Sequence, residues 1–317
     1  MSAKLITIFG GSGFIGRHLV GRLAAKGHQI RIATRDPEGA AQLMTQGTVG
    51  QILGFKTNVR DQRSVEKAVA GADIVINLVG VLYESGAQNF GRLHVDAAER
   101  IAAAAKAAGA QQLIHMSALG ASKDHESAYA RSKAVGEELA AKEYPGATIL
   151  RPSVVFGRDD DFFNRFASIL SLAPVFPLAD GGDKKMQPIW VEDLVDAIDR
   201  ILETPEQQGK VWEFSGPDAY SFCELMEKVL KFTNRKCLLL PVPSGMMSLM
   251  ATFMALAPGR PQLTPDQVKL LKYDNVPSGD FPNLEELGIN PTTIDAVVPE
   301  YLRRYRRGGG LKYEAEK

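Results

Sequence analysis

Three glycines, Gly10, Gly13 and Gly16, follow a short apolar run that begins at Ile6. Glycine permits the sharp turn and the close approach of backbone N–H groups that pyrophosphate binding requires, and the third glycine lets the next helix pack closely. Helical periodicity starts at Arg17, so a helix N-terminus with unpaired N–H donors would face the anion. This order of strand, glycine loop and helix predicts a dinucleotide site.

The end of the second apolar run indicates which nucleotide is bound. About 20 residues beyond the glycines, where a carboxylate commonly selects NAD, this sequence has Thr34 and Arg35. Arg35 could hold a 2′-phosphate through charge-assisted hydrogen bonds of about 1.5–3 kcal/mol, and Arg17 could add a second contact. We therefore expect NADPH, with Asn58 and Val59 flanking the adenine. The alternative is that Arg35 is an exposed loop charge without a ligand.

Ser117, Tyr129 and Lys133 form a second group that could do chemistry. Ser117 ends a predicted strand, while Tyr129 and Lys133 are four residues apart at the start of a predicted helix, hence on one face. A lysine ammonium lowers a neighbouring phenol pKa, so the tyrosine could exchange a proton with a carbonyl or alcohol near neutral pH. The serine would hold the same oxygen. The alternative is a chance helical pair whose lysine only binds the nicotinamide ribose.

Apolar runs alternate with helical patterns through the first half of the chain. The runs end near Gly10, Arg35, Asn58, Gly80, Ser117 and Arg151, and helical segments cover residues 64–70, 95–108 and 132–142. Near-continuous apolar strands separated by helices indicate a parallel sheet covered on both faces. The expected fold class is α/β, a doubly wound parallel sheet of the Rossmann type with a smaller C-terminal α/β subdomain. Ligands should bind at the carboxyl ends of its strands.

This alternation fades after Arg151, where proline-rich turns separate isolated strand candidates at residues 187–191, 211–215 and 237–242. We expect a nucleotide-binding domain over residues 1–155, with a returning element near 187–202. A substrate-type or docking subdomain is expected over residues 156–317.

Charge and composition exclude several classes of function. Lysines plus arginines and aspartates plus glutamates number 37 each, so no global field recruits nucleic acid. Cys223 and Cys237 are too few for a disulfide framework and lack metal-binding spacing, so we expect neither a disulfide nor a metal site. The first strand begins almost at Met1, and no run reaches about 18 apolar residues. We therefore expect a chain that is neither secreted nor membrane-spanning.

The motifs above resemble those of the short-chain dehydrogenase/reductase superfamily, particularly its extended and atypical members. Residues 151–157 are similar to the superfamily's segment lining the nicotinamide side, and residues 190–194 to its later turn into a helix. Together with the glycine motif, the resemblance implies a cofactor site formed by Gly10, Ser12, Gly13, Phe14, Ile15, Gly16, Arg17, Thr34, Arg35, Asn58, Val59, Leu78, Val79, Gly80, Ser117, Tyr129, Lys133, Pro152, Ser153 and Val154.

A narrower resemblance rests on the run 156–167, on Gln187-Pro188 and on the tail elements 284–289 and 301–304. This combination is similar to the family of NADPH-binding accessory subunits of respiratory complex I, the NADH:quinone oxidoreductase, in its bacterial form. The resemblance implies a nucleotide that stabilises the subunit and its docking without passing electrons. Its partners would be complex I subunits of the peripheral arm near the membrane junction. Its place would be the cytoplasmic face of the bacterial inner membrane, or the matrix side in an organelle.

Two later segments could contact a partner or a membrane. Residues 244–257 carry four of the nine methionines in an almost uncharged run, which suits an adaptable contact surface or a buried core helix. Four arginines near the end of the chain could meet anionic lipid headgroups at about 1 kcal/mol each, or form a solvated face. They are Arg303, Arg304, Arg306 and Arg307.

Three functions remain open from the sequence. The first is the accessory subunit, without independent turnover and with a vestigial catalytic triplet. Because Ser117, Tyr129 and Lys133 are all present, an occluded substrate pocket would have to explain inactivity. The second is a free NADPH-dependent reductase or epimerase, and the third is a nucleotide-sensing regulator. We favour the first.

Overall fold

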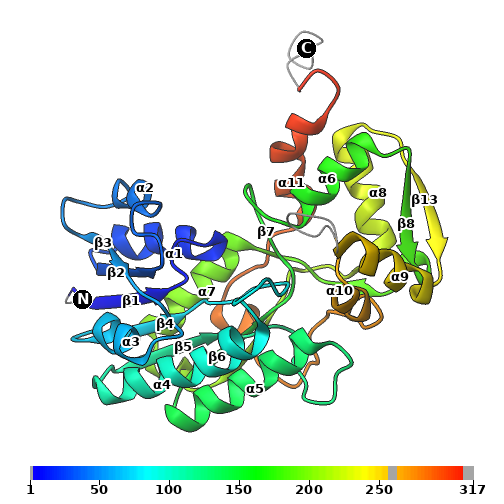
Figure 1. The fold of residues 1–317 in the computed structure, drawn as a ribbon. Helices are drawn as coiled ribbons and strands as arrows, with labels where there is room; N and C mark the ends of the chain where they lie inside the picture. Colours follow the sequence, from blue (N-terminus) through cyan, green and yellow to red (C-terminus); the bar gives the residue numbers. More distant parts are fainter. Residues whose placement is uncertain (1–2, 256–262, 310–317) are drawn as a thin grey trace. The chain divides into compact units, whose positions relative to one another are not determined.

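The computed structural model describes residues 3–255 and 263–309 of the 317-residue chain, which divide into two compact units (Figure 1). The first unit contains the chain up to Pro152, Val191–Phe214 and Gly279–Ile289. The second contains Ser153–Trp190, Ser215–Ser278 and the chain from Asn290 onwards. From the sequence we expected residues 279–289 in the second domain. They group with the first unit, where the Pro282 carbonyl accepts a hydrogen bond from the Glu213 backbone N–H at 3.0 Å.

Within the described residues of the first unit, seven parallel strands form one sheet in the order β11-β6-β5-β4-β1-β2-β3 (Figure 1). From β1, an interior strand of the sheet, the chain runs outwards to β3 and returns to the other side of β1 as β4. The carboxyl ends of β1 and β4 therefore flank the point where the strand order reverses, which is where doubly wound sheets bind ligands. The strands are β1 (Leu5–Phe9), β2 (Gln29–Thr34), β3 (Ile52–Lys56), β4 (Ile74–Asn77), β5 (Gln112–Met116), β6 (Thr148–Pro152) and β11 (Val211–Phe214).

Helices cover both faces of this sheet, with α3, α4 and α5 on one face and α1 and α7 on the other (Figure 1). The strands are buried on both sides, because residues such as Ile6, Ile8 and Val75 are fully inaccessible to solvent. The helices of this unit are α1 (Phe14–Ala25), α2 (Ala41–Met44), α3 (Gln62–Val69), the π-helical turn η1 (Gly91–Asp96), α4 (Ala97–Ala107), α5 (Ala128–Glu143), α7 (Val191–Glu203) and the short 3-10 turns η3 (Pro205–Gln207) and η4 (Glu285–Leu287).

The predicted α/β doubly wound sheet is confirmed, with differences at the ends of several elements, including the following two. The helix expected over residues 95–108 begins earlier, as the π-helical turn η1, before it continues as α4. In place of the strand expected at 187–191, the structure has a strand of two residues, Ile189–Trp190, and helix α7 begins at Val191. Both differences lie at element ends, where local sequence pattern is least informative.

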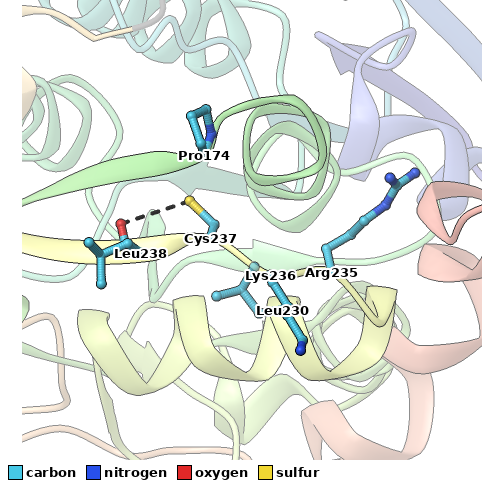
Figure 2. Close-up of a pocket in the computed structure, with 6 residues that line it drawn as sticks. All are labelled: Pro174, Leu230, Arg235, Lys236, Cys237 and Leu238. Carbon is cyan, nitrogen blue, oxygen red and sulfur yellow. Dashed lines mark hydrogen bonds between the residues drawn. The ribbon is translucent and has the colours of Figure 1, made fainter.

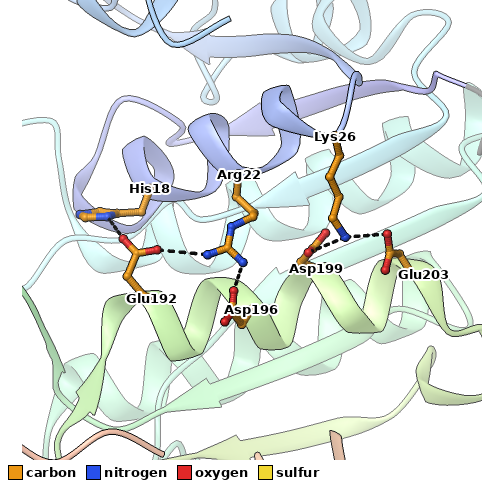
Figure 3. A network of polar contacts seen from close by, with 7 residues as sticks. All are labelled: His18, Arg22, Lys26, Glu192, Asp196, Asp199 and Glu203. Atoms are coloured by element: carbon orange, nitrogen blue, oxygen red, sulfur yellow. Dashed lines mark hydrogen bonds and ion pairs between the residues drawn. The ribbon is translucent and has the colours of Figure 1, made fainter. Parts of the chain in front are cut away.

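Ion pairs join α1, the helix that follows the glycine loop, to α7 (Figure 3). His18 Nδ1 lies 2.5 Å from Glu192 Oε1, and Lys26 Nζ lies 2.7 Å from Asp199 Oδ2 and 2.6 Å from Glu203 Oε1. Between these pairs, the Arg22 guanidinium contacts the carboxylates of Glu192 and Asp196. Spacings of four residues on α1, and of three or four residues on α7, place these side chains on the facing sides of the two helices.

The second unit is built from helices and short two-stranded sheets. β7 pairs with β10 and β8 with β13 in parallel, while β9 pairs antiparallel with β12. Its core is aromatic and aliphatic, with Phe156, Phe163, Leu225 and Val298 fully buried. The elements are β7 (Val155–Phe156), α6 (Phe163–Leu172), β8 (Val175–Ala179), η2 (Asp180–Gly182), β9 (Lys185–Met186), β10 (Ile189–Trp190), β12 (Tyr220–Ser221), α8 (Phe222–Thr233), β13 (Leu238–Val242), α9 (Ser244–Ala255), α10 (Pro265–Leu270), α11 (Ile294–Leu302) and η5 (Arg303–Tyr305).

The run 156–167 and the tail 301–304, which carried the narrower resemblance, are bonded to each other in the second unit. Asp160 is 3% exposed, and its carboxylate accepts from the Tyr301 hydroxyl at 2.6 Å and from the backbone N–H groups of Gly157 and Asn164 at 3.0 Å. Arg304 Nη2 donates to Asn164 Oδ1 at 2.5 Å. These distinctive residues therefore satisfy one buried carboxylate, and Arg304 is bonded to Asn164 of α6.

Tyr301→Phe is expected to lower the free energy of unfolding by about 1.5–3 kcal/mol, because it removes the short hydroxyl donor to a buried carboxylate. Urea unfolding of the full chain measures the loss. Tyr305→Phe is the matched control, since its hydroxyl is not part of this cluster, and it should change stability by less than about 0.5 kcal/mol. Equal effects of the two substitutions would contradict the assignment.

Candidate functional site

The glycine loop between β1 and α1 brings backbone close to backbone. Gly10 has a φ of +77°, and a Cβ there would lie 3.0 Å from the carbonyl carbon of Leu78. A Cβ on Gly16 would come within 2.5 Å of the Gly10 carbonyl oxygen and the Gly11 Cα, so α1 packs directly on the loop backbone. Gly13, at the N-cap of α1, provides no side-chain cap. The first turn of α1 begins with Phe14 and Ile15, whose backbone N–H groups are the ones placed to face an anion. The Arg17 backbone N–H donates to the Gly13 carbonyl at 3.0 Å and closes this turn.

The end of β2 lies beside this loop. Ser12 Oγ and Thr34 Oγ1 are 3.3 Å apart, within hydrogen-bond reach. Asp36 follows Arg35 directly, but its Oδ1 accepts from the Gly39 backbone N–H at 2.9 Å and is held in a local turn. Arg35 is exposed. The Thr34 hydroxyl also accepts from the Asp36 backbone N–H at 3.2 Å, so it is held within the turn. The end of β2 thus carries one exposed cation, Arg35, which fits the phosphate of a phosphorylated ribose.

Asn58 and Val59 follow β3 in a turn. The Asn58 side-chain oxygen accepts from the Arg60 backbone N–H at 3.1 Å, and Asn58 itself is exposed. The Val59 side chain packs against the core, while its carbonyl accepts from Arg100 Nη1 at 2.8 Å. Their role beside the adenine stays a prediction.

The loop after β4 joins the two predicted groups of residues. The Leu78 backbone N–H donates to the Phe9 carbonyl at 2.9 Å, which places the loop beside the glycine motif. The Val79 N–H donates to Asn77 Oδ1 at 3.1 Å. A Cβ on Gly80 would lie 3.3 Å from Lys133 Nζ, so this loop also faces the catalytic-type helix α5. The structure therefore brings the glycine loop and Lys133 to one edge of the sheet.

Lys133 lies beside Ser117 in the interior. Its ammonium donates to the Met116 carbonyl at 3.0 Å, and the residue is 4% exposed. Burial lowers the pKa of Lys133 to about 8, against the opposing charge of Glu137. Ser117 Oγ is buried and has no hydrogen-bond partner among the described residues. A buried hydroxyl without a partner, next to a cation and a glycine cradle, fits a bound nicotinamide ribose or carbonyl group.

The pKa expected for Tyr129 is wrong. Burial raises the pKa of its phenol to about 12, because the ring packs against Phe90 and His94 with centroids 5.8 and 5.4 Å away. The ammonium of Lys133 is directed to the Met116 carbonyl. The sequence placed the tyrosine and the lysine on one helical face, but it carried no information about how deeply the phenol is buried.

The remaining predicted contacts are divided between the units. Pro152 ends β6 in the first unit, where its carbonyl accepts from the Leu119 N–H at 3.0 Å. Ser153 and Val154 belong to the second unit, in which Ser153 Oγ donates to Asn275 Oδ1 at 2.7 Å. A cofactor role for these residues stays a prediction.

Sequence reasoning missed four polar residues around Lys133, namely Asn77, His94, His115 and Glu137, all less than 9% exposed. Asn77 Nδ2 donates to His115 Nδ1 at 3.1 Å, which leaves the proton of the neutral ring on Nε2. The signal for His115 was present, since a histidine inside an apolar strand is unusual. Nothing in the local pattern singled out His94 or Glu137.

Comparison with known proteins identifies the family. The model of the NAD dependent epimerase/dehydratase family matches residues 6–214. The protein "NADH dehydrogenase (ubiquinone) 1 alpha subcomplex subunit 9, mitochondrial" from Rattus norvegicus is 35% identical over 318 residues, covering 100% of this chain and 84% of the relative. The chain belongs to the NAD dependent epimerase/dehydratase family and, within it, to the subunit 9 family. Both family resemblances inferred from the sequence are confirmed.

A fungal protein and a solved bacterial reductase are also similar to this chain. The Neurospora crassa "NADH-ubiquinone oxidoreductase 40 kDa subunit, mitochondrial" is 28% identical over 300 residues, covering 95% of this chain and 79% of that protein. An NADPH-dependent quinone oxidoreductase from Escherichia coli, solved with NADPH, superimposes with a TM-score of 0.75 at 20% identity, covering 94% of this chain and 99% of that one. That likeness confirms the fold.

Proposed function

We propose that this protein is an accessory subunit of respiratory complex I that binds NADPH as a structural ligand. The observation that carries the proposal is its 35% identity, over its whole length, to a protein named as a subunit of NADH dehydrogenase. A second support is the hydrogen bond between Asp160 and Tyr301. Both residues belong to the segments that carried the narrower family resemblance, and this bond connects those segments within the second unit. The chain would join subunits of the peripheral arm near the membrane junction.

Fractionation of detergent-solubilised membranes tests this assignment. A tagged copy of the chain, expressed in its own cells, is separated on a density gradient and followed together with NADH:quinone oxidoreductase activity. The tag and the activity should peak in the same fractions. Recovery of the chain only as a free soluble species would overturn the proposal.

The preference for NADPH rests on the end of β2. Arg35→Ala is expected to weaken NADPH binding about 10- to 150-fold, because the guanidinium contributes about 1.5–3 kcal/mol towards a 2′-phosphate. NADH binding should change less than about twofold. Isothermal titration of both nucleotides measures the difference. Arg63→Ala, which removes an exposed cation on α3, is the matched control. Equal losses for NADPH and NADH would show that Arg35 does not read the phosphate.

Independent turnover is not part of this proposal. A phenol with a pKa of about 12 is a poor proton donor and acceptor near neutral pH, and Phe90 and His94 pack against the ring of Tyr129. Ser117, Tyr129 and Lys133 would then hold the nucleotide without passing a hydride to a substrate. Tyr129→Phe should leave complex I activity unchanged. NADPH oxidation that depends on Tyr129 across a panel of carbonyl compounds would favour a free reductase or epimerase.

A peripheral position on the membrane surface is supported by the second unit. Apolar side chains are exposed on β8 and β13 and at the end of α6, among them Leu172 at 87% and Leu238 at 58%. Leu238 lines an open hollow of about 520 Å³ together with the basic residues Arg235 and Lys236 (Figure 2). An apolar face edged by cations fits an anionic bilayer surface. No helix among residues 3–255 and 263–309 has the length and apolar character needed to cross a bilayer.

The methionine-rich segment contributes both to the core of the second unit and to its exposed surface. Met247 and Ala251 are buried against Ala179 and Val268, whereas Met246 and Met250 on the same helix α9 are exposed. Residues 256–257 of the segment lie outside the described residues. We place this surface on the cytoplasmic face of a bacterial inner membrane, or the matrix side in an organelle. Sedimentation with phosphatidylglycerol vesicles, and not with phosphatidylcholine vesicles, is the expected result.

A further inference from the structure

His94 connects the loop after β4 to helix α5 through both of its ring nitrogens. The residue is 2% exposed and lies in the π-helical turn η1, a kind of turn that is frequent at functional sites. Nε2 accepts a hydrogen bond from the Val81 backbone N–H at 3.0 Å. Nδ1 lies 2.8 Å from Ser132 Oγ, and the Ser132 hydroxyl donates to the Tyr129 carbonyl at 2.7 Å.

These contacts fix the tautomer of the His94 ring. A backbone N–H can only donate, so Nε2 must be the unprotonated acceptor and Nδ1 must carry the proton. Nδ1–H then donates to Ser132 Oγ, whose own proton goes to Tyr129. One chain of hydrogen bonds therefore runs from Val81 through His94 and Ser132 to the first turn of α5.

Packing contacts also hold the His94 ring in position, in addition to its hydrogen bonds. The imidazole stacks on Phe90 with centroids 5.2 Å apart and meets the Tyr129 ring edge-on at 5.4 Å. A Cβ on Gly136 would lie 2.1 Å from the His94 carbonyl oxygen, so only glycine allows α5 to approach η1 this closely. A Cβ on Gly80 would lie 3.8 Å from His94 Nε2, which puts the loop and the ring in contact.

We propose that His94 is a positioning residue that fastens the loop 78–81 to α5 and thereby holds the nucleotide site open in one arrangement. The inference rests on the proposed binding of NADPH by Leu78, Val79 and Gly80. His94 itself would touch no phosphate. It acts through the Val81 N–H, because loss of the Nε2 acceptor leaves that donor without its partner and frees the loop to move away from Lys133.

Two substitutions of His94 distinguish the role of Nε2 from that of Nδ1. The amide oxygen of glutamine can occupy the place of Nε2, whereas asparagine reaches only the place of Nδ1. In the full-length protein, His94→Asn is expected to weaken NADPH binding about tenfold and to speed hydrogen exchange at the Val81 amide at least as much. His94→Gln should stay within about threefold of the wild type in both measurements. Equal behaviour of the two variants would overturn the inference.

Wild-type protein provides an independent readout if the asparagine variant does not fold. The imidazole ¹⁵N shifts of His94 should report the Nδ1–H tautomer, and an Nε2–H tautomer would overturn the inference. Failure of the wild-type protein to bind NADPH would overturn the proposed function. The positioning role would then still be decided by Val81 exchange in the asparagine and glutamine variants.

Discussion

Lowering the pH from 7 to 4.5 is expected to reduce the free energy of unfolding by about 5 kcal/mol, mainly through His94 and His115. Burial, with a smaller contribution from the charge of Lys133, lowers the pKa of His94 to about 2 and that of His115 to about 3. In the unfolded chain both rings titrate near 6.5. Below that pH the unfolded chain binds protons that the folded protein does not. The contribution of these two neutral rings to the free energy of unfolding is therefore fully present above pH 6.5 and is lost as the pH falls towards 3.

The size of this effect follows from the two rings together. Each contributes about 1.4 kcal/mol per pH unit between pH 6.5 and its own lowered pKa, hence about 2.5 kcal/mol at pH 4.5. Urea unfolding at half-unit steps between pH 4.5 and 8 measures the slope. His115→Gln should remove about half of it, and the double variant with His94→Gln nearly all. A slope that persists unchanged in the double variant would show that other groups cause the acid sensitivity.

Arg151→Met is expected to lower the free energy of unfolding by about 3–5 kcal/mol, because it leaves buried carboxylates without their cation. The Arg151 guanidinium bonds to both oxygens of Glu137, with Nη2 2.6 Å from Oε2 and Nε 3.0 Å from Oε1, and its Nη1 lies 3.6 Å from Glu213 Oε1. Glu137 and Glu213 are 7% and 4% exposed. The guanidinium also lies 4.9 Å from the ring centroid of Phe281.

Two further variants distinguish charge from geometry at this site. Arg151→Lys keeps the positive charge but loses the bidentate contact with Glu137, so the expected loss of unfolding free energy is intermediate. Adding Glu137→Gln and Glu213→Gln to Arg151→Met should recover a substantial part of the stability, since it removes the uncompensated charges. Urea unfolding at pH 7 compares all three proteins with the wild type. A loss below about 1 kcal/mol for Arg151→Met would mean that the carboxylates are not held by this arginine.

The secondary structure around the glycine motif could be predicted from the local sequence pattern. The apolar run into Gly10, the spacing to Gly16 and the helical periodicity after it predicted β1, the loop and α1, because each of these depends on residues within one turn or one strand. The apolar run predicted to end near Arg35 is strand β2, which ends at Thr34. Strands alternating with helices in turn required a parallel doubly wound sheet.

The environment of each candidate residue was decided only by the tertiary structure. From the spacing alone we expected Lys133 to lower the pKa of Tyr129, but burial against Phe90 and His94 raises that pKa to about 12. The contacts of α1 with α7 join residues such as Arg22 and Glu192, 170 positions apart, and Tyr301 meets Asp160 across 141 positions. Periodicity specifies which face of an element is apolar, not which distant element covers it. Burial, which sets both pKa values and the strength of charge pairs, arises only when those elements assemble.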